Sequence, residues 1–315
     1  MLSCHRKLKL LACNSNPDLA NEISVHLDIP CIDSEIGRFS DGEIRVEIEE
    51  SIRGADVFVI QSMTAPVHEN IMELLLVTDA LKRASVRTIT AVIPYYAYAR
   101  QDRKSQPREP IAAKLLANLL QASGIDRVLT MDLHAPQIQG FFDIPVDNLE
   151  GVPLIADYLS SQGLDGCAVV SPDVGGVRRA RGLAERLGAS LAIIDKRRPQ
   201  PNVSEVMNII GDVSGRKCVL IDDMIDTAGT ITQGASALIK CGATEVLACC
   251  THGVLSGSAI EKLDNSIIKE IVVTNTIPGY THSTLNKITT ISVGRLFAEA
   301  IMRIHEERSV STLFN

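Results

Sequence analysis

Short apolar segments rich in β-branched residues alternate with longer segments of helical periodicity along most of the chain. The short segments are apolar on both faces, which is typical of strands buried in a parallel sheet with helices on either side. This alternation predicts an α/β fold. The predicted strands are 86–93, 127–131, 167–170, 191–194, 218–221 and 245–250, and the predicted helices are 111–122, 174–187, 228–241 and 293–307.

Residues 44–49 follow a different pattern. Ile44, Val46 and Ile48 alternate with charged residues, and such alternation predicts a half-exposed antiparallel strand. The dipeptide Asp41-Gly42 lies just before this segment and predicts a tight turn. A hairpin is therefore expected in the first part of the chain.

Both halves of the chain share one plan, in which a strand is followed by a charged loop and a helix. With 315 residues, the chain is also longer than the ~100–200 residues of a typical domain. We therefore expect two similar domains, each a mainly parallel sheet flanked by helices. Their expected bounds are 1–148 and 149–305, followed by a C-terminal tail of 306–315.

Composition narrows the range of partners. The chain carries 31 basic and 38 acidic residues, a net charge of −7, which argues against a general nucleic-acid or anionic-membrane surface. No stretch approaches the ~20 apolar residues of a membrane span. The eight cysteines show no C-x-x-C and no Cys/His spacing of the zinc type. We expect a cytoplasmic protein without nucleic-acid or membrane partners.

The sharpest motif spans residues 219–230, where an apolar strand ends in two carboxylates and a Thr/Gly-rich turn opens a helix. Backbone N–H groups of such a turn and the positive end of the helix favour a phosphate group. The carboxylates suit the vicinal hydroxyls of a sugar, because they accept hydrogen bonds. Helix capping by the turn is the alternative explanation. The predicted sugar-phosphate site consists of Asp222, Asp223, Asp226, Thr227, Ala228, Gly229 and Thr230.

A cluster of three cations follows the predicted strand 191–194. Lys196, Arg197 and Arg198 precede Pro199 and are expected on a loop. Positioned cations stabilise the charge that develops on phosphate oxygens during phosphoryl transfer, so we expect this loop to act as a lid. A solvated basic loop is the alternative.

Two further residues, Asp173 and His134, follow predicted strands, where open α/β proteins bind their ligands. Mg²⁺ prefers oxygen ligands, so Asp173 is the better match on chemical grounds. A satisfied core histidine is the alternative for His134. Arg178, Arg179 and Arg181 alternate with apolar residues and are expected on the solvated face of a helix.

Another charged segment, residues 100–104, follows a hydrophobic run that ends in three tyrosines. Arginine makes bidentate phosphate contacts and glutamine can bind a base or a ribose, so Arg100 and Gln101 are candidates for nucleotide binding. An RNA-stacking surface is disfavoured, because aromatic residues form only 3% of the chain.

Taken together, these motifs resemble the class I, bacterial-type ribose-phosphate diphosphokinase (PRPP synthetase) family. Type I phosphoribosyltransferases share the 219–230 motif with that family. The resemblance extends over essentially the whole chain. The additional segments that carry it, in the family's order, are Arg38–Glu43, Tyr98–Lys104, Asp132–Phe142, Ser171–Gly176 and Asp195–Pro199.

The resemblance implies two phosphoribosyltransferase-like domains, with ATP-binding loops in the first and a ribose 5-phosphate site in the second. It implies transfer of the β,γ-diphosphoryl group of ATP to the C1 hydroxyl of ribose 5-phosphate with release of AMP. The product would feed nucleotide, histidine and tryptophan biosynthesis. Lys196 and Arg198 would contact the reacting phosphates, and Arg198 also the sugar phosphate.

The same resemblance implies Mg²⁺ as cofactor, held with ATP by His134 and Asp173. It implies a homo-oligomer, hexameric in the family, with the active site at a subunit interface. A second interfacial site would bind phosphate or ADP, with 309–314, Arg53, Arg83 and Ser85 as candidates. The implied ATP-binding residues are Arg100, Gln101 and His134, and Phe39, Asp41, Gly42 and Glu43 of a neighbouring subunit.

Two other functions stay open from the sequence. A phosphoribosyltransferase that consumes PRPP explains 219–230 but gives no role to 41–43, 100–104 and 196–198. The other is a non-catalytic regulatory homologue that binds nucleotide or holds partner subunits together, but the intact cations of 196–198 argue against it.

Overall fold

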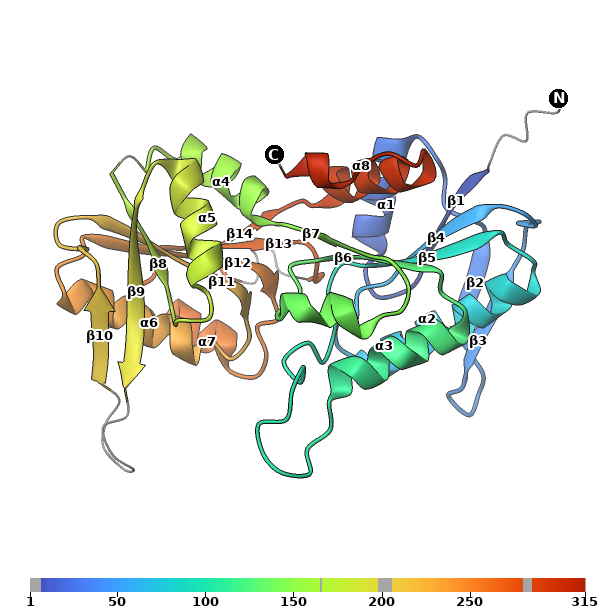
Figure 1. The fold of residues 1–315 in the computed structure, drawn as a ribbon, viewed down its shortest axis with the longest axis horizontal. Coiled ribbons are helices and arrows are strands. Elements are labelled where there is room, and N and C mark those ends of the chain that lie inside the picture. Colours follow the sequence, from blue (N-terminus) through green and yellow to red (C-terminus); the bar gives the residue numbers. More distant parts are fainter. Residues whose placement is uncertain (1–6, 165, 198–205, 280–284, 315) are drawn as a thin grey trace. The chain divides into compact units, whose positions relative to one another are not determined.

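The computed structural model describes residues 7–164, 166–197, 206–279 and 285–314. The chain forms two compact units, each with its own sheet (Figure 1). Unit 1 consists of Met1–Glu150, Thr276–Pro278 and Ser292–Asn315, and unit 2 consists of Gly151–Asn275 and Gly279–Ile291.

Unit 1 is built on a five-stranded parallel sheet. Helices α2 (Val67–Arg83) and α3 (Ala112–Ser123) cover one face, and α1 (Pro17–Leu27) and α8 (Gly294–His305) cover the other (Figure 1). The strand β4 is buried along its whole length, as expected for a strand covered on both faces. In spatial order the strands are β1 (Leu8–Ala12), β4 (Asp56–Ile60), β5 (Thr88–Ile93), β6 (Arg127–Met131) and β7 (Val146–Leu149).

A two-stranded antiparallel hairpin of β2 (Ser34–Arg38) and β3 (Ile44–Ile48) packs against α2. This confirms the hairpin predicted from the alternation of residues 44–49. The turn closes through a bond from Gly42 N–H to the Phe39 carbonyl at 3.0 Å, and Gly42 has a φ of 96°. A positive φ at this position favours glycine.

Unit 2 is built on a seven-stranded sheet that is parallel except for β10. Helices α4 (Val152–Ser161) and α5 (Val177–Leu187) cover one face, and α6 (Gly229–Lys240) and α7 (Ala259–Asp264) cover the other (Figure 1). The strand order is β10 (Val206–Ile210), β9 (Ser190–Arg197), β8 (Ala168–Ser171), β11 (Lys217–Ile225), β12 (Glu245–Gly253), β13 (Glu270–Thr274) and β14 (Ile288–Ile291).

The core of unit 2 explains why its strands are apolar on both faces. Val219 and Ile221 of β11 belong to the cluster that includes residues of α4 and α5. Cys218 and Leu220, which alternate with them, belong to the cluster that includes residues of α6 and α7. Successive side chains of a strand point to opposite faces, so both faces of β11 are covered. The α/β prediction is confirmed.

The strand order of unit 2 also predicts where a ligand binds. From β8 the chain passes through α5 to β9 on one side, and from β11 it passes through α6 to β12 on the other. Since β8 and β11 are neighbours, their carboxyl ends open a crevice between these two diverging connections. Open α/β proteins bind ligands at such a switch point.

The division into units differs from the expected one at the C-terminal end. Residues 292–305 were expected in the second domain, but α8 belongs to unit 1, where it packs against α1. Burial of Phe297 and Ile301 supplies the driving force. Among the described residues, the helices fall short of the length and apolar character that a membrane crossing requires.

Candidate active site

The loop that follows β11 has the geometry of a phosphate-binding turn. Helix α6 begins at Gly229, so the first N–H groups of the helix face the loop 226–228. Ala228 precedes the helix with a φ of 61° and is buried. A left-handed alanine is strained, and Thr227 and Thr230 on either side are exposed. The turn therefore presents backbone donors and hydroxyls to solvent.

The loop is held from the outside by the segment that follows β12. Ser256 donates its N–H to the Asp226 carbonyl at 3.0 Å, and its hydroxyl bonds the Asp226 carboxylate. Lys262 of α7 donates to the Thr227 carbonyl at 3.1 Å. These bonds fix the backbone of the turn before any ligand binds.

The two carboxylates were expected where the strand ends, but β11 continues to Ile225, and within its last four residues they share one cation. Nη1 of Arg179 lies 3.5 Å from Oδ1 of Asp222 and 3.5 Å from Oδ1 of Asp223. The backbone N–H of Asp223 also donates to Asp222 Oδ1 at 2.9 Å. Arg179 was expected on a solvated helix face. That expectation is wrong, because α5 packs against β11 and the Arg179 side chain is only 17% exposed.

The acidic side chains differ in access. The Asp223 side chain is 4% exposed, whereas that of Asp222 is 25% exposed. Burial, and then repulsion from Asp223, raise the pKa of Asp222 to about 7, while Arg179 and the Asp223 N–H lower it. Asp222 is therefore the member of the pair that a ligand can reach.

Asp173 lies on the other side of the crevice, in the loop between β8 and α5. Its Oδ1 accepts the N–H of Gly176 at 2.9 Å, and its carbonyl accepts the Ser171 hydroxyl at 2.6 Å. A Cβ at Gly176 would lie 2.9 Å from Ser171 Oγ, so a larger residue there would displace the hydroxyl that bonds the Asp173 carbonyl. The exposed Asp173 carboxylate is presented at the same edge of the sheet as Asp222.

The predicted loop position of Lys196 is wrong. Lys196 lies in β9, where it is paired with Met207 of the antiparallel strand β10, and Arg197 is paired with Val206. Strand pairing extends β9 beyond the apolar segment that signalled it. Arg198, the second expected cation, lies outside the described residues.

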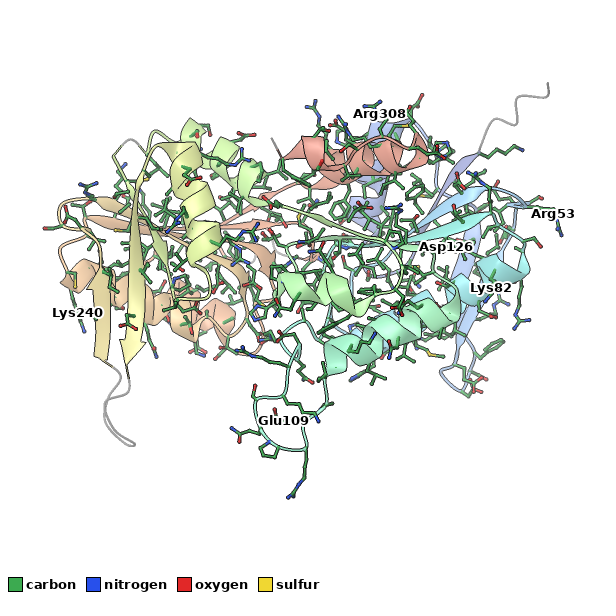
Figure 2. All side chains as sticks on the ribbon, in the orientation of Figure 1. Arg53, Lys82, Glu109, Asp126, Lys240 and Arg308 are labelled. Carbon is green, nitrogen blue, oxygen red and sulfur yellow. The ribbon has the colours of Figure 1, made fainter. Side chains whose placement is uncertain are left out.

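In unit 1, the candidate nucleotide-binding residues lie on loops after neighbouring strands. Arg100 and Gln101 follow β5, His134 follows β6, and all three are exposed. Gln137 donates to Asp102 at 2.7 Å and joins the two loops. Figure 2 shows Glu109 farther along the loop after β5. The structure therefore places these candidates on linked loops of one unit.

The other expected ATP-binding residues, Phe39 and 41–43, lie at the turn of the β2–β3 hairpin. Asp41 accepts the N–H of Glu43 at 3.1 Å, and Phe39 is 52% exposed. The hairpin lies apart from the loop after β5 within unit 1 (Figure 1). The two groups of predicted ATP-binding residues are thus not brought together within unit 1.

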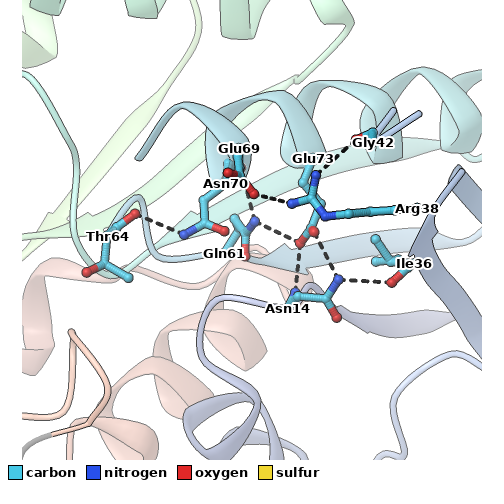
Figure 3. Close-up of polar contacts among 9 residues, drawn as sticks. All are labelled: Asn14, Ile36, Arg38, Gly42, Gln61, Thr64, Glu69, Asn70 and Glu73. Carbon is cyan, nitrogen blue, oxygen red and sulfur yellow. Dashed lines mark hydrogen bonds and ion pairs between the residues drawn. The ribbon is translucent and has the colours of Figure 1, made fainter. Parts of the chain in front are cut away.

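A polar network anchors the hairpin on α2 (Figure 3). Arg38 forms an ion pair with Glu69 and donates to the Gly42 carbonyl at 3.1 Å. Glu73, one turn farther along α2, is buried and accepts from Asn14 N–H at 2.7 Å and from Gln61 Nε2 at 2.9 Å. Asn14 Nδ2 bonds both Glu73 and the Ile36 carbonyl of β2, so the network extends from α2 to the hairpin.

The donor set bears on metal binding. Among the described residues, no group of three or more His, Cys, Asp and Glu side chains is arranged to hold a metal ion. Mg²⁺ in nucleotide sites commonly takes one or two carboxylates and completes its shell with phosphate oxygens and water. The exposed carboxylate of Asp173 fits such a partial shell better than the imidazole of His134 does.

Comparison with known proteins assigns these features to one family. Residues 8–124 match the family model for the N-terminal domain of ribose phosphate pyrophosphokinase, and residues 196–315 match that for the phosphoribosyl synthetase-associated domain. The ribose-phosphate pyrophosphokinase of Bacillus caldolyticus is 61% identical over all of both chains. The chain belongs to the ribose-phosphate pyrophosphokinase family. The ribose-phosphate pyrophosphokinase of Halalkalibacterium halodurans is 62% identical over 98% of each chain.

A solved member of this family shares the fold. The phosphoribosylpyrophosphate synthetase of Mycobacterium smegmatis is 42% identical, with a TM-score of 0.91 over 96% of this chain and 100% of that one. The resemblance drawn from the motifs is therefore confirmed. Pyrophosphokinase relatives that match along the whole chain disfavour the two alternatives, a phosphoribosyltransferase and a non-catalytic homologue.

One residue of the site was missed from the sequence of this pyrophosphokinase-family chain. Arg179 stands between Arg178 and Arg181, both exposed, and nothing in their spacing separates it from them. Its position one residue before the buried Ala180 and four before the buried Leu183 was the available signal. Residues so placed lie at the edge of a buried helix face.

Proposed function

We propose that this chain is a ribose-phosphate diphosphokinase that converts ATP and ribose 5-phosphate into 5-phospho-α-D-ribose 1-diphosphate (PRPP) and AMP. The observation that carries the proposal is the position of Asp222 and the turn 226–230 at the switch point of unit 2. A carboxylate beside a phosphate-binding turn is complementary to a sugar phosphate.

In this proposal, ribose 5-phosphate binds with its phosphate on the N–H groups and hydroxyls of 226–230 and its ring hydroxyls on Asp222. The buried Asp223 supports Asp222 rather than meeting the sugar itself. The fixed turn orients the C1 hydroxyl before reaction, which lowers the entropic part of the barrier. The hydroxyl then attacks the β-phosphorus in line, and AMP leaves with the bridging oxygen.

ATP binds, in the same proposal, to Arg100, Gln101 and His134, with Phe39 and residues 41–43 contributed by a neighbouring subunit. The separation of these groups within unit 1 supports an active site shared between two subunits. A shared site requires a homo-oligomer, which we propose is a hexamer, as in the family. Lys196 and Arg198 stabilise charge on the transferred diphosphoryl group. Asp173 holds Mg²⁺, with His134 as a second contact, and the metal neutralises phosphate oxygens when bound.

The cellular setting is also proposed. We infer a cytoplasmic enzyme that serves nucleotide biosynthesis and binds phosphate or ADP at a second site. In unit 1, Arg303 bonds Thr312 at 2.7 Å and the Ser309 carbonyl at 3.1 Å, and Ser85 accepts the Gly54 N–H at 2.9 Å. These contacts hold two of the segments that contain candidate regulatory residues, 309–314 and the turn at Ser85.

The test is direct. The chain is incubated with ATP, ribose 5-phosphate and Mg²⁺, and the products are separated by anion exchange. AMP and PRPP in equal amounts are expected, and Lys196→Ala is expected to lower turnover by orders of magnitude. Release of pyrophosphate that depends on an added base, without AMP formation, would instead indicate a phosphoribosyltransferase. Absence of both products would indicate a non-catalytic homologue.

A further inference from the structure

The guanidinium of Arg179 reaches across the crevice of unit 2 at its switch point. Arg179 is the third residue of α5, which follows β8, whereas the carboxylates that it meets lie among the last four residues of β11. A single nitrogen, Nη1, lies 3.5 Å from one oxygen of Asp222 and 3.5 Å from one of Asp223. The side chain therefore connects α5 with β11 beside the proposed sugar site.

We propose that Arg179 is a positioning residue of the sugar site, which holds the Asp222 carboxylate oriented and charged so that it accepts the vicinal hydroxyls of ribose 5-phosphate. The inference rests on the proposed function and adds a residue to it. Arg179 acts through Asp222 and Asp223, and no contact between Arg179 and the substrate is part of the proposal.

The electrostatic argument starts from the adjacent carboxylates. Two neighbouring acids that are removed from water disfavour double ionisation, and one of them takes up a proton unless a cation compensates. Asp223 is almost fully buried, so its charge needs a partner within the protein. Arg179 supplies positive charge to both acids at equal distances.

The two buried thiols that interact with the pair do not supply that charge. Cys249 and Cys250 lie on β12, the strand beside β11, and burial raises the pKa of both thiols, so they stay neutral near neutral pH. Burial and Asp223 raise the pKa of Asp222, and Arg179 is the cation that opposes this shift. Removing Arg179 would therefore raise that pKa further.

The ionised form of Asp222 is the one that binds sugar hydroxyls best. A carboxylate offers acceptors only, and hydrogen bonds to a charged acceptor are the stronger kind. A protonated Asp222 would present one donor and weaker acceptors to a diol. Arg179 therefore sets the pH below which the sugar site loses affinity.

The helix itself offers matched controls. Arg178 and Arg181 lie on α5 within two residues of Arg179, are exposed, and have the same charge. Replacing any of the three with glutamine removes one positive charge from the same helix. A long-range charge effect would appear in all three variants, whereas positioning of Asp222 would be lost in Arg179→Gln alone.

The experiment measures binding of ribose 5-phosphate without ATP, by isothermal titration calorimetry from about pH 5 to about pH 9. Arg179→Gln is expected to raise Kd on the order of 10- to 100-fold at neutral pH. It should also move the acid limb of the binding profile to higher pH. Arg178→Gln and Arg181→Gln should retain the wild-type Kd and profile, and Arg179→Lys should lie between wild type and Arg179→Gln.

A double-mutant cycle separates positioning from a structural role. In an Asp222→Asn background no charge remains for Arg179 to hold at position 222, so Arg179→Gln should add little further loss. A wild-type Kd and an unshifted acid limb for Arg179→Gln would overturn this inference and leave the proposed function standing. Equal and additive losses in both backgrounds would overturn it as well. Absence of binding by the wild-type chain would overturn both this inference and the proposed function.

Discussion

The side-chain nitrogen of Lys262 lies 3.1 Å from the carbonyl oxygen of Thr227. This bond joins α7 to the turn that we propose binds the sugar phosphate. Two main-chain hydrogen bonds lie beside it. The N–H of Leu255 donates to the Ile225 carbonyl, and the N–H of Ser256 donates to the Asp226 carbonyl, both at 3.0 Å. The turn is therefore preorganised by a segment about thirty residues farther along the chain.

Replacing Lys262 with alanine should loosen the turn. Because Lys262 is exposed and the two main-chain bonds stay in place, we expect a modest rise of about 3- to 10-fold in KM for ribose 5-phosphate, equal to about 1 kcal/mol. The turnover at saturating sugar phosphate should change little. Lys240→Ala, which removes an exposed lysine from α6, is the control and should leave KM as in the wild type. A KM that rises equally in both variants would contradict a specific role of Lys262.

The raised pKa of Asp222 gives a prediction that combines stability and activity. Since its pKa in the folded chain lies above the ordinary carboxylate value, the folded chain binds the extra proton between about pH 4 and about pH 7. The ionised Asp222 therefore destabilises the fold above that window. Asp222→Asn should raise the free energy of unfolding by on the order of 2 kcal/mol at about pH 8 and by little at about pH 4.

The same substitution should weaken sugar-phosphate binding measurably, because an amide replaces a charged acceptor at the site. Thermal unfolding at the two pH values, together with calorimetric titration, measures both effects. Asp157→Asn on α4, an exposed carboxylate, is the control and should change neither. An Asp222→Asn chain that is no more stable at high pH than the wild type would refute the destabilising role.

Two glutamates one turn apart on α2 should differ in their effect on stability. Glu73 is buried and accepts hydrogen bonds from Asn14 and Gln61, whereas Glu69 pairs with Arg38 at the surface (Figure 3). Glu73→Gln should lower the free energy of unfolding by about 1–3 kcal/mol, because an amide donor then faces donors in a buried site. Glu69→Gln should cost less than about 1 kcal/mol.

Urea unfolding of both variants, monitored by circular dichroism, measures the difference. If the network holds the hairpin for ATP, as proposed, Glu73→Gln should also raise KM for ATP while the Kd for ribose 5-phosphate stays unchanged. Equal unfolding free energies for the two variants would show that the buried network contributes nothing beyond the surface pair.

Ala228 carries the strained backbone of the turn that we propose binds the sugar phosphate. With a φ of 61°, the residue adopts a conformation that costs alanine about 1–2 kcal/mol and glycine little. Ala228→Gly should therefore hold or raise the melting temperature, and Ala228→Val should lower it. Ala237→Gly, inside α6, should lower stability by about 1 kcal/mol. Differential scanning fluorimetry distinguishes these outcomes, and a loss of stability in Ala228→Gly as large as in Ala237→Gly would contradict the strain.

Much of the site could be predicted from the sequence, because its signals are local. The apolar segment before Asp222 and the Thr/Gly turn after Asp226 encode a buried strand and a helix start in neighbouring residues. Carboxyl ends of parallel strands meet at one edge of a sheet, so Asp173 and Asp222 could be placed at that edge without a structure. The hairpin turn at Gly42 was equally local.

The errors arose where a contact joins distant parts of the chain. Arg179 contacts Asp222 and Asp223, more than forty residues away, because β8 and β11 are neighbours, which the order of elements along the chain does not reveal. Lys196 lies in a strand because β10 pairs with β9. Helix α8 packs against α1 although nearly the whole chain separates them.

The sequence by itself determined the class of fold, the family, the position of the proposed sugar-phosphate turn and the residue types that it presents. These follow from periodicity and from short motifs, in which the interacting groups are neighbours along the chain. Tertiary structure alone decided which acid is exposed, which arginine holds it and to which unit the last helix belongs. Each of these depends on the order of strands and on burial, and burial is a property of the packed chain rather than of any segment.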